Sequence, residues 1–185
     1  MFNKSDKFAQ MNRGKTSEIS QLLDFFPEIP LPIVLSEDLA ITFSANNKPI
    51  PTALIATTLA KWEPLDEYTE IVPCFLIPIN EKCDAIVYWV GSLMTYEYIV
   101  VTIQEKQKLV NKKVIAGTIS NGQTIKKSVA HIDEDFNIRC VVGESKVGDK
   151  YSPDHSKSFG FEILPDGQIM TSDEENNIWQ QEKTK

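Results

Sequence analysis

Hydrophobic positions along the chain change their period once, close to residue 70. Before that point apolar residues recur at helical offsets or lie between prolines. After it they alternate with polar residues or form short apolar runs. Each later run ends at a turn signal, of which Asn121-Gly122 is the strongest. The pattern predicts an α+β fold in which N-terminal helices precede an antiparallel meander.

Two amphipathic helices are predicted in the first part of the chain. One covers Thr16–Phe26, where Thr16 or Ser17 is available as a cap and Pro27 stops the helix. The other covers Thr52–Trp62, whose apolar residues follow the i, i+3, i+4 offsets of a buried stripe. Both helices need an apolar surface to cover.

The segment between these helices is predicted to be mostly extended. Pro27–Leu35 contains three prolines, which exclude a helix or a central strand and favour an extended path over the core. Ser36 is a candidate helix cap that would turn Leu39 and Phe43 inward, although Ile41–Phe43 is equally typical of a strand.

Eight strands are predicted after the acidic Glu63–Glu70 loop. Pro73 and Pro78 mark the ends or the edge position of the first strand, and Asp84–Val90 is apolar on both faces, as in a central strand. The strands cover Ile71–Ile79, Asp84–Val90, Met94–Ile103, Leu109–Ile119, Thr124–Ile132, Phe136–Val142, Phe159–Leu164 and Gln168–Thr171.

The short links make consecutive strands neighbours in space, and the sheet then either curls toward a half-barrel or stays open beneath the helices. We favour the open, helix-covered sheet. The length suits one domain. Residues 1–15 are expected to be a flexible arm, 16–172 a single α+β domain (16–69 helical and extended, 70–172 the meander), and 173–185 a polar tail that hangs loose unless Trp179 pins it.

The net charge of -7 disfavours nucleic acid as a partner, because a phosphate backbone would be repelled on average. The most basic stretch contains no arginine, and we interpret its lysines as a solvated sheet edge guarded against pairing. These lysines are Lys106, Lys108, Lys112, Lys113, Lys126 and Lys127.

The three cysteines, Cys74, Cys83 and Cys140, are odd in number and lie in strand-like apolar settings. This favours packed, reduced thiols and a cytoplasmic location over a zinc site, because no close C-x-x-C pair is present. The first fifteen residues lack a continuous apolar stretch, so neither a signal peptide nor a membrane anchor is expected.

Four polar clusters are weak candidates for chemistry. Asp133–Asn137 with Glu144 matches part of a calcium loop, but Ile138 stands where that loop requires glycine. Ser152, Asp154, His155 and Ser156 crowd into one loop, whereas triad residues converge from separate elements. His131 lies on a predicted strand, and Glu174 with Glu175 lies in the polar tail. No glycine-rich phosphate loop occurs, and we assign no catalytic residue, metal or cofactor.

Aromatic residues give the best remaining sign of function. Tyr88, Trp89, Tyr96 and Tyr98 are of the types that dominate recognition surfaces, although burial in the core is the more common role. Tyr96 and Tyr98 are predicted to share one sheet face. We favour a non-enzymatic, cytoplasmic, acidic protein of the inhibitor or immunity kind that binds a protein partner. The alternative is a small-molecule binder or enzyme with a pocket in a curled sheet, with His131 or His155 at its rim.

Overall fold

The computed structural model describes residues 17–147 and 156–171. The strands of these residues form one antiparallel sheet in the order β2-β3-β4-β5-β6-β7-β8-β9, with β1 paired to β6 beside that path. The predicted α+β meander is therefore confirmed. The strands are β1 (Ile33–Leu35), β2 (Glu70–Asn80), β3 (Cys83–Gly91), β4 (Thr95–Gln104), β5 (Lys108–Ser120), β6 (Thr124–Ile132), β7 (Asn137–Lys146), β8 (Lys157–Ile163) and β9 (Ile169–Thr171).

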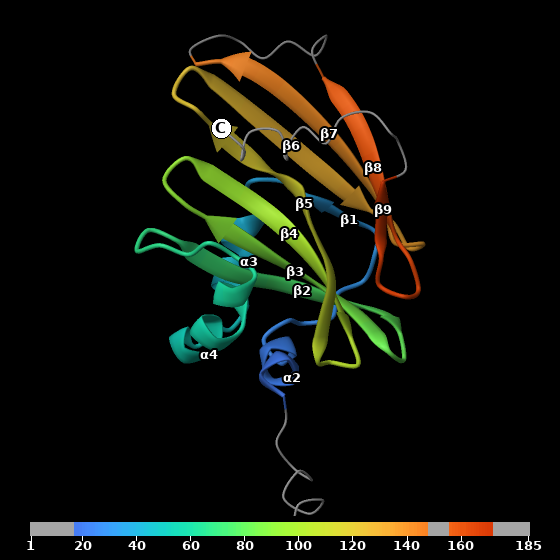
Figure 1. Cartoon of the computed structure of the whole chain (residues 1–185). Coiled ribbons are helices and arrows are strands. Elements are labelled where there is room, and N and C mark those ends of the chain that lie inside the picture. Colours follow the sequence, from blue (N-terminus) through green and yellow to red (C-terminus); the bar gives the residue numbers. More distant parts are fainter. Residues whose placement is uncertain (1–16, 148–155, 172–185) are drawn as a thin grey trace, which may run out of the picture.

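The sheet curls without closing into a barrel. β5 pairs with β4 along almost its whole length but with β6 only over residues 117–120, and β1 takes the place beside β6 over residues 130–132. Figure 1 shows the consequence, with β2–β4 in the lower half of the molecule, β6 and β7 in the upper half, and β5 running from one half to the other. At the far end, the β8–β9 turn bonds to the first half of the sheet, because Thr102 Oγ1 donates to the Gly167 carbonyl at 2.6 Å.

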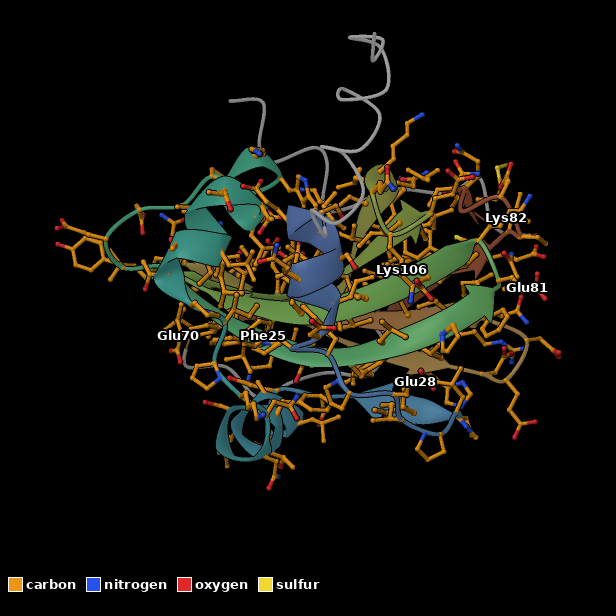
Figure 2. The ribbon with its side chains drawn as sticks, turned by 90° about the horizontal axis from the view of Figure 1, so that it is seen from below. Phe25, Glu28, Glu70, Glu81, Lys82 and Lys106 are labelled. Atoms are coloured by element: carbon orange, nitrogen blue, oxygen red, sulfur yellow. The ribbon has the colours of Figure 1, made fainter. Side chains whose placement is uncertain are left out.

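Apolar side chains fill both faces of β2–β5. On β3, Ala85 and Val87 belong to the core inside the curl, whereas Ile86 and Tyr88 belong to a second core on the outer face. The prediction that this strand is central, with both faces covered, is thus confirmed. Because both faces need cover, helices lie on each side of the strands (Figure 2).

The outer face of β2–β5 is covered by α2 (Glu18–Leu23), α4 (Thr52–Thr57) and the 3-10 turn η1 (Leu59–Lys61). Ser17 caps α2 as predicted, since its Oγ accepts a bond from the Ser20 amide at 2.9 Å. The predicted continuous helix over Thr52–Trp62 is wrong. The Thr58 hydroxyl donates to the Leu54 carbonyl and the Thr58 backbone leaves the helical region, so that Leu59 turns fully into the core.

The inner side of the curl is closed by α3 (Leu39–Asn46), which lies with β1 on the other side of the β2 edge from α2 and α4 (Figure 2). The ambiguous Ile41–Phe43 segment is helical, and Phe43 is buried against Phe75. Asp38, not Ser36, occupies the N-cap position, and Ser36 contributes its carbonyl to the Leu39 amide instead of its side chain.

The backbone at the outer edge of β2 disfavours pairing with a further strand. Pro73 and Pro78 supply no N–H, in agreement with their predicted edge position, and each lies at a register shift. The Pro27 carbonyl accepts a bond from the Leu76 amide at 2.9 Å, and Glu28 forms a bridge to the same residue. The segment Pro27–Leu35, predicted to be extended, thus bonds to this edge of β2 at one end and pairs with β6 at the other.

Gly117 lies where β5 begins to pair with β6, and it lets β5 approach β4 closely at that point. Its φ is +150°, and a Cβ placed there would lie 2.0 Å from the Tyr96 carbonyl oxygen. No side chain fits in this position. Gly122, by contrast, has a φ of +85°, and a Cβ placed there would have nothing within 4 Å.

We expect Gly117→Ala to lower the free energy of unfolding by about 3 kcal/mol, because it combines backbone strain with a collision against β4. Gly122→Ala is the matched control and should cost about 1 kcal/mol, since only the backbone conformation is strained. Urea unfolding of both variants measures the difference. Equal losses would mean that the close approach to Tyr96 does not constrain β5.

Candidate binding groove

A groove of about 500 Å³ lies between α3 and the strands β2–β4. It is open to solvent, as Ile41 is 72% and Tyr96 38% exposed. Its lining combines small and apolar side chains, two aromatic rings and two carboxylates. The lining residues are Glu37, Ala40, Ile41, Ser44, Ala45, Glu70, Val72, Trp89 and Tyr96.

The floor of the groove consists of two rows that cross β2, β3 and β4. In one row Val72 pairs with Trp89, which pairs with Tyr98. In the next row Glu70 pairs with Gly91, which pairs with Tyr96. Residues paired across strands share a face of the sheet, so Glu70 and Tyr96 flank a position that has no side chain.

The Trp89 indole occupies that empty position. A Cβ on Gly91 would lie 2.4 Å from Trp89 Cη2 and 2.7 Å from Cζ3, so the six-membered ring of the indole lies over the Gly91 backbone. There it stacks on Tyr96, with ring centroids 5.7 Å apart and planes 6° from parallel. Gly91 is therefore what allows the Trp89 ring to lie in this row and stack on the Tyr96 ring.

Both ends of α3 are tied to the sheet, which fixes the opposite wall. At the start, the Tyr98 hydroxyl donates to the Ser36 carbonyl at 2.8 Å, and burial raises the pKa of Tyr98, so the group stays a donor. At the end, the side-chain amide of Asn47 donates to the carbonyls of Pro73 and Cys74, each at 2.7 Å. The groove is thus formed before any ligand arrives.

Exposed apolar side chains gather at this end of the sheet. Since Glu70 pairs with Gly91, the loop before β2 and the β3–β4 hairpin lie side by side. Together with α3 they carry five of the ten large hydrophobic side chains that are exposed in the described part of the chain: Ile41, Tyr68, Leu93, Met94 and Tyr96. An exposed apolar surface of this kind is typical of an interaction site.

The two carboxylates at the rim differ in their environment. Glu37 forms an exposed salt bridge with Lys127 of β6 at 2.8 Å. Glu70 is exposed at the start of β2 (Figure 2), and among the described residues no lysine or arginine lies within salt-bridge distance of it. One carboxylate is thus compensated and the other is available to a ligand.

The predicted aromatic set divides into two pairs. Tyr96 and Tyr98 share one face, as predicted, and Tyr98 is core. Tyr88 is also core, on the opposite face of the sheet. Trp89 and Tyr96 instead line the groove. Sequence reasoning missed Glu70, Ile41 and Gly91, and only the alternation register that pairs Glu70 with Gly91 could have pointed to them.

A buried polar cluster joins η1 to the outer face of the sheet. The Tyr88 hydroxyl donates to Glu63 Oε1 at 2.6 Å, and Lys112 Nζ donates to the same oxygen at 2.9 Å and to the Trp62 carbonyl at 2.6 Å. Burial and the Glu63 charge raise the pKa of Tyr88. Tyr88 and Glu63 are buried, Lys112 is partly exposed, and the three groups bond to one another, so we interpret the cluster as an anchor for η1.

The lysines of the basic stretch do not form one surface. Lys112 binds Glu63 on the outer face, Lys113 lies over the Phe161 ring at 5.8 Å from its centroid, and Lys127 pairs with Glu37. The edge prediction holds for Lys108, Lys112 and Lys113, which lie on the part of β5 that pairs with β4 alone. It is wrong for Lys126 and Lys127, which lie on β6 between β5 and β7, and Lys112 is bound to Glu63 rather than freely solvated.

The other residues that the sequence suggested for chemistry do not line the groove. His131 lies on β6 between Val34 and Arg139, away from the groove. The Asp133 carboxylate accepts bonds from the amides of Asp135 and Asn137, which makes the predicted hairpin turn. Within residues 17–147 and 156–171 no group of three His, Cys, Asp or Glu side chains is placed to hold a metal ion. Ser152, Asp154, His155, Glu174, Glu175 and Trp179 lie outside the described residues.

Comparison of the chain with family models, curated proteins and solved structures yields no match. None of the helices in the described ranges has the length and apolar character needed to cross a bilayer.

The three cysteines are free and buried, as predicted for packed thiols. Burial raises the pKa of Cys140 from 9.0 to about 12, and it raises the pKa of Cys74 and Cys83 as well. Cys140 Sγ also lies 3.0 Å from the Ile115 carbonyl, to which the neutral thiol donates.

We expect the neutral Cys140 thiol to stabilise the fold below pH 9, and this contribution to be lost as the pH rises from 9.0 to about 12. The sign follows because the unfolded chain releases the proton first, so that folding must take it up again. The free energy of unfolding should thus fall more steeply with pH in the wild type than in Cys140→Ala. Parallel curves would show that this thiol is not desolvated.

The stack of Trp89 on Tyr96 is expected to break in Gly91→Ala, because the new methyl group occupies the place of the indole. We expect altered near-UV circular dichroism and a loss of about 1–3 kcal/mol in the free energy of unfolding. In a Trp89→Leu background the same change should cost less than about 0.5 kcal/mol, since no ring remains to be displaced. A similar cost in both backgrounds would contradict the role given to Gly91.

Proposed function

We propose that the protein binds another protein through the groove between α3 and β2–β4, and that it acts by binding rather than by catalysis. The observation that carries this proposal is the Trp89–Tyr96 surface, which continues into exposed apolar side chains on α3 and on the β3–β4 hairpin. Aromatic residues on a preformed surface are typical anchors of protein recognition.

The volume of the groove also suits a small molecule, since such sites span about 300–1,000 Å³. Small-molecule sites, however, enclose most of their ligand, and this groove is lined by side chains as exposed as Ile41 at 72% and Tyr96 at 38%. The groove lining contains no histidine. A partner that covers the groove and the hairpin together fits this surface better than an enclosed ligand.

Alternative partners are supported less well. The dispersed lysines offer no continuous basic face to a phosphate backbone. Edge pairing at β2 is opposed by two prolines and by the Pro27–Glu28 contact. Reduced, buried thiols suit the cytoplasm, where we place the protein in this proposal.

Site-directed photocrosslinking in extract of cells that express the chain tests the proposal. A photoreactive residue at Leu93 should give protein adducts that disappear in the Trp89→Ala and Ile41→Asp backgrounds. The matched control carries the same residue at Val141, which is 45% exposed on the outer side of β7, and its adducts should not depend on Trp89. Adducts at Leu93 that persist without Trp89, or no adducts there, would contradict the groove as the binding surface.

A further inference from the structure

We infer that the groove recognises a basic side chain, a lysine or arginine flanked by apolar residues, which inserts between the Trp89 ring and Glu70. The inference rests on the proposed function and specifies its partner. It starts from the row in which Glu70, Gly91 and Tyr96 are paired across three strands.

One face of the Trp89 ring is stacked on Tyr96, and the ring also lines the groove. The ring lies over Gly91, in the middle of the row, and its plane is 6° from parallel to that of Tyr96 on β4. Tyr96 covers the face turned toward β4. The second face is turned toward β2, where Glu70 stands at the rim of the same groove.

A cation fits the space between an aromatic face and a carboxylate better than any neutral or anionic group. The negative face of the indole attracts an ammonium or guanidinium group, and the carboxylate adds a charge-assisted hydrogen bond. Glu70 has no cationic partner among the described residues, whereas Glu37 is neutralised by Lys127 at 2.8 Å. The charge complementarity is thus located at one side of the groove, and the net charge of -7 adds a general attraction for a basic partner.

The apolar remainder of the groove defines the neighbours of that basic residue. Ala40, Ala45 and Val72 are small or aliphatic and leave room beside the aromatic rings. An aliphatic or aromatic side chain next to the cation would fill this room and cover Ile41. The expected partner segment is therefore basic and apolar, not polybasic.

A phage-displayed library of random peptides, selected separately on the wild-type protein and on variants, tests this inference. Wild-type selection should enrich lysine or arginine beside apolar residues. Selection on Glu70→Lys should enrich aspartate or glutamate instead. For synthetic copies of the wild-type peptides, Glu70→Gln and replacement of the peptide's basic residue by norleucine should each weaken binding by about tenfold.

Glu134→Gln is the matched control, because Glu134 is an exposed carboxylate in the turn between β6 and β7 and does not line the groove, so this variant should bind nearly as well as the wild type. Equal losses of peptide affinity for the two variants would overturn a specific cation-binding position between the Trp89 ring and Glu70, called the cation seat below. Selection of purely apolar peptides whose binding requires Trp89 but does not change in the Glu70 variants would contradict the cation seat and still support the groove as the docking site. If no selected peptide depends on Trp89, both the seat and the proposed function are contradicted.

Discussion

The central strands of the sheet have apolar side chains on both faces, and the rest of the structure depends on burying both of them. β3 places Ala85 and Val87 in one core and Ile86 and Tyr88 in the other. Neither face can remain in water without a large loss of stability. The curl of the sheet and α3 bury the inner face, and α2, α4 and η1 bury the outer face. Gly117 lets β5 approach β4 closely within this curl, since only a residue without a side chain can lie against the Tyr96 carbonyl.

The groove exists because cover on the inner side ends before the sheet does. α3 is short and is fixed at Ser36 by Tyr98 and at Asn47 by the carbonyls of Pro73 and Cys74. It seals the interior up to the row of Val72, Trp89 and Tyr98. The next row, from Glu70 to Tyr96, extends beyond that seal. A tethered wall and a rigid floor bind with little loss of conformational entropy, which favours recognition of a partner by side chains.

The fold could largely be predicted from the sequence because the pattern of apolar residues follows element periods over long stretches. β6 begins and ends at the residues predicted, Thr124 and Ile132, and the alternation placed Tyr96 and Tyr98 on one face. The fold predictions that were wrong concern the ends of two helices. At Thr58 a hydroxyl bonds to a backbone carbonyl where the helix ends. At the start of α3, Ser36 is bonded by Tyr98 from sixty-two residues away, and Asp38 takes the N-cap position. Neither interaction leaves a periodic signal.

The site was less predictable than the fold, since its parts become neighbours only through strand register. Glu70 and Gly91 carry no motif, and a shift of one residue in the pairing of β2 with β3 would place Glu70 on the opposite face from Trp89 and Gly91. The backbone at the edge of β2 is consistent with the proposed recognition by side chains and disfavours strand addition. At the edge of β2, prolines and the Pro27 carbonyl occupy the backbone groups that a foreign strand would need. At the groove, by contrast, the Gly91 backbone is covered by the Trp89 indole, so a ligand there would meet aromatic side chains and a carboxylate.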